Sequence, residues 1–87
     1  MTIKAVIIAA INAKVVKYNL WRIGLTHDPA ERKDFWTAKE RTTSWTQWQA
    51  DSLDEAQAIE AYFIGRGMKG GVGGDLSSRQ TVYVYIF

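Results

Sequence analysis

The chain has 87 residues, of which 47% are hydrophobic and 13% aromatic, and its formal net charge is +2. This length predicts one domain over residues 1–87, and the aromatic content favours a compact core over disorder. The absence of cysteine excludes disulfides and thiolate zinc sites, and a single histidine argues against a His-rich metal site.

Positive charge is concentrated in the first half of the chain. Residues 1–41 hold eight Lys/Arg and four Asp/Glu, whereas residues 42–87 hold three and five. This asymmetry is compatible with contact to a phosphate backbone, although an ordinary solvated surface is the more common origin of so modest an excess.

The first predicted element is a helix that begins at Thr2 and runs to about Lys17. The spacing of its Ile and Ala residues supports a helix, while two consecutive valines near its end suit a strand, so residues 3–17 form either a helix or a strand hairpin. The apolar run 5–11 is too short to cross a bilayer, and no signal-peptide cleavage site follows it. We therefore expect a soluble, cytoplasmic protein without membrane contact.

A strand over Leu20–Thr26 and a helix from Pro29 to about Glu40 come next. Apolar and polar residues alternate along the strand, which indicates that one of its faces is buried. Asp28 suits the cap of the following helix, and proline suits its first turn because the missing N–H costs nothing there.

This strand and helix bring together a glycine and two cations. Arg22 and Gly24 share the polar face of the strand, and Arg32 lies one turn into the helix. A bare backbone beside positive charge is what a phosphate or carboxylate site requires. One interpretation of the chain is therefore a small-anion binding domain.

The second half begins with a Thr- and Trp-rich strand at residues 41–50. Ser52 and Glu55 then form a capping box, which predicts a helix that ends at the glycines of residues 65–67. The capping box accounts for Glu55 without any further role.

Glu60 falls inside the apolar arc of this helix. A carboxylate in such a position is costly unless a cation, an arginine or a metal pairs with it. The alternatives are that a slight rotation of the helix exposes Glu60 to solvent, or that it forms an ordinary ion pair with Arg22 or Arg32.

Two elements remain in residues 67–87. The Gly-rich run Gly67–Asp75 is typical of a mobile loop, and it could also hold a phosphate with help from Lys69. Strand Thr81–Phe87 has one aliphatic and one aromatic face, which suits a strand covered on both sides or, alternatively, a base-stacking platform. Together the elements predict a small α+β domain, with a three-stranded, mainly antiparallel sheet and about three helices packed on it.

Residues 20–65 resemble the second half of the motif of GIY-YIG nucleases. Arg22-Ile23-Gly24 stands at the second triplet, and Thr26, Pro29 and Arg32 match the variant form K-I-G-x-T-x-x-P-x-x-R. Glu60, in an Ala-rich helix, matches the metal-binding glutamate of that family. No Gly-Ile-Tyr triplet precedes the strand, so the catalytic tyrosine is missing from its usual place, and Tyr18, Tyr83 and Tyr85 are candidates to replace it.

The resemblance implies roles for these residues. Glu60 would hold Mg²⁺, and Arg32, helped by Arg22, would neutralise charge on the phosphoryl oxygens. Nucleic acid would contact Arg22, Gly24, Lys33 and Lys69. The function implied is a metal-dependent DNA endonuclease or a non-cleaving nucleic-acid binder, with catalysis itself left open.

The alternative function is a small non-catalytic interaction module of a bacterium or phage. Such a module would bind a protein partner or form a homodimer, for which strand Thr81–Phe87 is the candidate contact. The two functions differ in structure: a nuclease needs Arg32 and Glu60 in one cleft, whereas an interaction module needs an exposed apolar patch.

Overall fold

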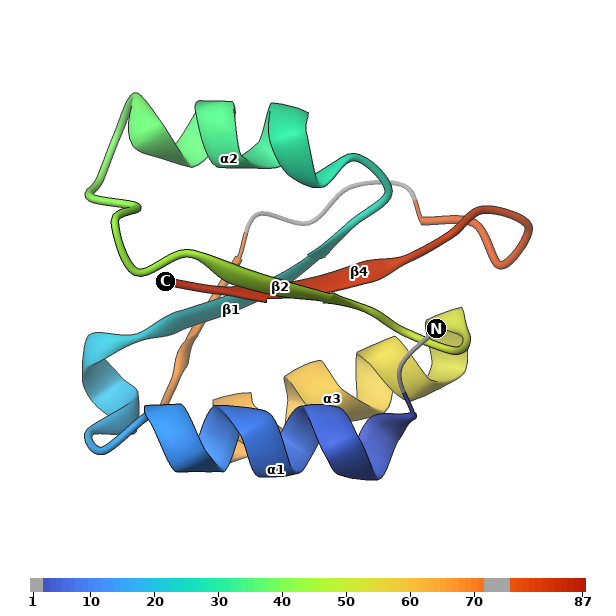
Figure 1. The fold of residues 1–87 in the computed structure, drawn as a ribbon, viewed down its shortest axis with the longest axis horizontal. Coiled ribbons are helices and arrows are strands. Elements are labelled where there is room, and N and C mark those ends of the chain that lie inside the picture. Colours follow the sequence, from blue (N-terminus) through green and yellow to red (C-terminus); the bar gives the residue numbers. More distant parts are fainter. Residues whose placement is uncertain (1–2, 72–75) are drawn as a thin grey trace.

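The computed structural model describes residues 3–71 and 76–87, and these combine α-helices with one β-sheet in an α+β fold. Figure 1 shows a central sheet with helices on both of its faces. The described residues form four strands in the order β2-β4-β1-β3. The strands are β1 (Arg22–Thr26), β2 (Thr46–Gln49), β3 (Lys69–Gly70) and β4 (Tyr83–Ile86).

The sheet is mixed, and the predicted three antiparallel strands make up most of it. β4 pairs antiparallel with both β1 and β2, while the two-residue β3 pairs parallel with β1. The sequence analysis missed β3 because it lies in the Gly-rich run and is too short to show a period. The rest of that run, residues 72–75, lies outside the described residues.

Helices α1 (Lys4–Lys14) and α3 (Leu53–Gly65) cover one face of the sheet. Residues 3–17 therefore begin with a helix and form no strand hairpin, and the proposed cap Thr2 lies outside the described residues. The hydrophobic core lies between these helices and the sheet. Its fully buried members come from both helices, from β1, and from β4 with the residue before it: Ile7, Ile11, Ile23, Ala56, Ile59, Phe63, Val82, Val84 and Ile86.

Helix α3 begins and ends as its sequence predicts. The Ser52 hydroxyl accepts a hydrogen bond from the Glu55 amide at 3.2 Å. Only this half of the predicted capping box forms, because the Glu55 carboxylate makes no return bond to Ser52 among the described residues. At the other end Gly67 has a φ of +111°, and the amides of Gly67 and Met68 bond to the carbonyls of Ile64 and Phe63. This is the Schellman arrangement, in which a left-handed glycine satisfies the last carbonyls of a helix.

Helix α2 (Pro29–Thr37) lies on the opposite face of the sheet, above the aromatic side of β4. Asp28 caps it by accepting a bond from the Glu31 amide at 3.1 Å. Trp36 is the one buried residue of this helix. It joins an aromatic cluster formed by Trp36, Trp45, Tyr85 and Phe87.

Both faces of β4 are thus covered, which supports core packing over a base-stacking platform. Tyr85 is fully buried, and Trp45 stacks on it with ring centroids 4.5 Å apart. The expected dimer contact through strand Thr81–Phe87 is wrong, because β4 lies inside the sheet with β1 and β2 on its two sides. No helix among residues 3–71 and 76–87 is long and apolar enough to cross a membrane.

Candidate functional site

Tyr85 lies at the centre of the region in which the sequence places a site. It pairs with Gly24 across the β1–β4 ladder, and its ring lies directly over that glycine. A Cβ added at Gly24 would be only 2.3 Å from the Tyr85 hydroxyl, and one at Gly71 only 2.7 Å away. Gly24 is therefore buried beneath the phenol ring of Tyr85. The missing side chain of this glycine makes room for that ring.

The Tyr85 hydroxyl accepts a hydrogen bond from the indole N–H of Trp36 at 2.9 Å. Burial is the largest influence on Tyr85 and raises its pKa above the ordinary value. The charge of Glu60 also raises the pKa. The hydrogen bond from Trp36 and the charges of Arg32 and Arg22 lower it in part. All three residues predicted to be catalytic therefore act electrostatically on this hydroxyl, but none of them bonds to it.

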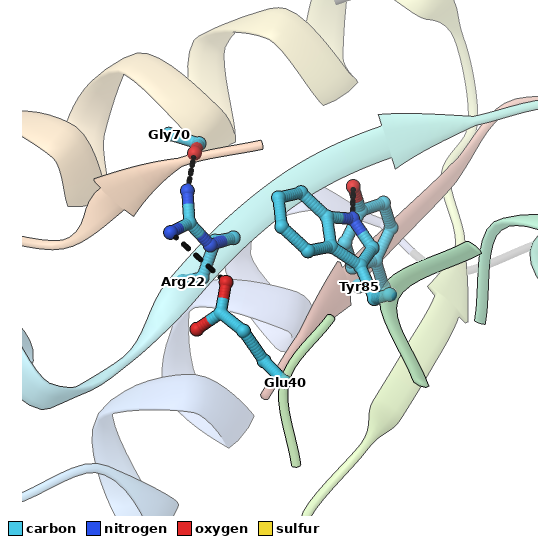
Figure 2. Close-up of polar contacts among 5 residues, drawn as sticks. Arg22, Glu40, Gly70 and Tyr85 are labelled. Atoms are coloured by element: carbon cyan, nitrogen blue, oxygen red, sulfur yellow. Dashed lines mark hydrogen bonds and ion pairs between the residues drawn. The ribbon is translucent and has the colours of Figure 1, made fainter. Parts of the chain in front are cut away.

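Arg22 is held by three contacts at the edge of the aromatic cluster (Figure 2). Its guanidinium donates to the carbonyl of Gly70, pairs with Glu40 at 3.2 Å and lies over the Trp36 ring at 4.5 Å from the centroid. These contacts fix β1, β3 and α2 relative to one another. Arg22 consequently has a structural role, whatever else it binds.

Arg32 and Glu60 have no ion-pair partner within the described residues. Arg32 lies over the Phe35 ring and lines a hollow of about 180 Å³ beside Asp28 and Glu31, and its Nε is buried without a hydrogen bond. Glu60 is partly buried on α3 and does not line this hollow. The alternative of an ion pair between Glu60 and either Arg22 or Arg32 is therefore not realised in the described part of the chain.

A second hollow brings two of the predicted nucleic-acid contacts together. It has a volume of about 160 Å³ and lies where β1, β3 and β4 meet the segment after α2. We call it the basic pocket; it is lined by Leu20, Trp21, Arg22, Glu40, Arg41, Lys69 and Phe87. Its one carboxylate, Glu40, is already paired with Arg22, so positive charge is in excess.

Arg41 is the pocket residue that sequence reasoning did not single out. It belongs to no helix or strand of the structure, so the periodicity of the sequence does not identify it as a site residue. The sequence analysis counted Arg41 only among the basic residues of the first half and at the start of the strand expected at residues 41–50. Of the other predicted contacts, Lys69 lines the pocket, whereas Lys33 is exposed on α2 and does not.

A magnesium ion at Glu60 would take most of its ligands from water and substrate phosphates. Magnesium sites in proteins normally use one or two carboxylates with waters or substrate phosphates. Residues 3–71 and 76–87 contain no cluster of three His, Asp or Glu side chains that could hold a metal. Burial also raises the pKa of Glu60, which disfavours the ionised form that a metal needs.

The raised pKa of Glu60 gives a pH-dependent prediction. Because the folded state favours the protonated carboxyl, the stability that Glu60 contributes is present in acid and is lost as the pH rises through its raised pKa. Glu60→Gln mimics the protonated form, so it should raise the Tm by a few degrees at most at pH 7 and leave it unchanged near pH 3.

Thermal melts followed by circular dichroism at both pH values measure this effect. Asp34→Asn, which changes an exposed carboxylate on α2, is the control and should not stabilise the protein. An equal Tm change at both pH values for Glu60→Gln would contradict the assignment to burial.

Comparisons with models of known protein families, with curated proteins and with solved structures give no match to this chain.

Proposed function

We propose that this chain is a diverged GIY-YIG-like domain that binds nucleic acid at the basic pocket and does not cleave it. The observation that carries the proposal is the pocket itself. Three cations, Arg22, Arg41 and Lys69, line the pocket. Its single carboxylate is Glu40, which is paired with Arg22. The side chains of Trp21 and Phe87 also line it. Cations combined with aromatic rings are the usual means of holding a phosphate backbone and its bases.

The position of β4 supports the relationship to that family. β4 lies antiparallel to the strand that carries Arg22-Ile23-Gly24, with Tyr85 opposite Gly24. A complete family member would fill this place with the strand of its first triplet. We infer that the last strand of this chain has taken over that place, with Tyr85 standing for the missing tyrosine.

The state of Tyr85 favours binding over cleavage. A tyrosine that activates water must reach the solvent and release its proton, but Tyr85 is fully buried and burial raises its pKa. Tyr85 in this state is therefore poorly suited to activate water. Catalysis is therefore not part of the proposed function.

The test is a titration of fluorescently labelled single- and double-stranded oligonucleotides, read by anisotropy at several salt concentrations. Arg41→Ala and Lys69→Ala should each weaken binding about three- to tenfold and lower the slope of log K against log salt by about one. Neither side chain has an ion pair among the described residues, so folding should be preserved.

Arg79→Ala is the matched control, because it removes one exposed positive charge outside the basic pocket. It should change affinity less than twofold. Equal losses for all three variants would mean that net charge alone drives binding and would contradict the pocket. Mg²⁺-dependent cleavage of the oligonucleotides, abolished by Arg32→Ala, would replace the proposal with the nuclease function.

A further inference from the structure

Arg66 lies against two tyrosine rings on the surface of the domain. Its guanidinium carbon is 4.8 Å from the ring centroid of Tyr18 and 5.6 Å from that of Tyr62. Arg66 is itself exposed and forms no ion pair within the described residues, and Tyr62 is 42% exposed. We call these three residues the tyrosine–arginine stack. The stack offers solvent a positively charged guanidinium together with an aromatic ring.

The stack lies beside the basic pocket, because the same two chain segments contribute to both. The short 3₁₀ helix η1 (Tyr18–Leu20) begins in the stack and ends at a residue that lines the pocket. Arg66 is followed three positions later by Lys69, which also lines the pocket. Three residues span at most about 11 Å of backbone, so one short nucleic-acid segment can reach both the pocket and the stack.

These two segments carry positive charge and no negative charge. Residues 12–27 and 61–71 contain no Asp or Glu. Their cations are Lys14, Lys17, Arg22, Arg66 and Lys69. The positive charge of the basic pocket therefore continues to the stack, and an anionic partner that is held in the pocket meets no repulsion from these segments.

We propose that the basic pocket and the tyrosine–arginine stack together bind single-stranded nucleic acid. This inference rests on the proposed function and names the substrate class of the same site. A phosphate occupies the pocket, while an unpaired base stacks on Tyr62 and Arg66. The bases of a duplex are already stacked and paired, so their faces cannot reach the stack. Charge alone would favour the duplex, whose charge density is higher, so a preference for single strands depends on the stack.

The test is an anisotropy titration of a labelled single strand and of the duplex with the same sequence, at one salt concentration. The wild type should bind the single strand at least about tenfold more tightly. Tyr62→Leu keeps an apolar side chain on α3 but removes the ring. It should weaken single-strand binding about five- to twentyfold and leave duplex binding unchanged. Tyr62→Phe keeps the ring and should stay within about twofold of the wild type.

Phe35→Leu is the matched control. Phe35 is 36% exposed, and Arg32 and Lys39 lie over its ring, so this residue also combines an aromatic ring with cations. Its helix α2 carries Glu31 and Asp34, however, and Phe35 does not line the basic pocket. Phe35→Leu should change single-strand affinity less than about twofold. Circular dichroism establishes that each variant is folded.

The outcomes separate this inference from the proposed function. A wild-type chain that binds neither the single strand nor the duplex would overturn both. Binding that Arg41→Ala weakens, but that is equal for the two forms or stronger for the duplex, would leave the proposed function intact and overturn the single-strand assignment alone. Equal losses for Tyr62→Leu and Phe35→Leu would overturn that assignment as well.

Discussion

Gly24→Ala should destabilise the domain by about 3 kcal/mol and lower its Tm by more than 10 °C, one of the two largest effects we expect from a single substitution. The added methyl group would be 2.3 Å from the hydroxyl and 2.4 Å from the Cζ atom of Tyr85. The ring cannot move aside, because Trp45 stacks on it and the backbone of Gly71 lies beyond its hydroxyl.

The control for this experiment is a glycine in open space. A Cβ at Gly65, the last residue of α3, would meet no atom within 4 Å. Gly65→Ala should therefore stabilise the protein by about 0.5–1 kcal/mol, since alanine favours the helix. Chemical denaturation of both variants gives the two values. A small loss for Gly24→Ala, similar to an ordinary surface change, would show that Tyr85 does not cover this position.

Trp36→Ala should cost about 3–5 kcal/mol, a large part of the stability of a domain of this size. Trp36 is the one buried side chain of α2, so its loss removes the main attachment of that helix to the sheet. The same change removes the ring that lies under Arg22 and the N–H that bonds to Tyr85. We expect α2 to become a site of early proteolysis, because a detached helix exposes its backbone.

Two variants separate the contributions of Trp36. Trp36→Phe keeps an aromatic ring under Arg22 but loses the indole N–H and part of the buried ring volume, so it should cost about 1–3 kcal/mol, less than Trp36→Ala. Phe35→Ala changes the neighbouring ring, which is 36% exposed, and should cost less than Trp36→Ala. Denaturation midpoints and limited proteolysis give both readouts. If Phe35→Ala were the more damaging, the anchor of α2 would be Phe35.

The sequence predicts local structure well where the signal is local. The Asp28-Pro29 start of α2 and the Ser52 cap of α3 each depend on neighbouring residues, and both are confirmed. The alternation in β1 correctly predicts a strand, but the expectation of a single buried face is wrong, because Gly24 and Thr26 on the other face are buried as well. The bounds are less well predicted. The strand expected at residues 41–50 is limited to Thr46–Gln49, and the helix expected to reach Lys17 ends at Lys14.

What could not be predicted depends on contacts between distant segments. Nothing in the sequence near Gly24 indicates that Tyr85, sixty-one positions later, would cover it. Arg41 joins Arg22 and Lys69 only because the sheet order brings three segments to one edge. The missing half of the capping box could not be predicted either, because the sequence gives the type of residue at Glu55 but not the rotamer of its carboxylate.

The strand order also determines when this chain can fold. β4 is the last strand in the sequence, yet it occupies the interior of the sheet, and β2 pairs with no other strand among the described residues. During synthesis, β1 and β2 must therefore wait for residues 83–86 before their antiparallel ladders can form. Long sequence separation between paired segments slows folding, so we expect a domain that folds late and all at once, after its last strand leaves the ribosome.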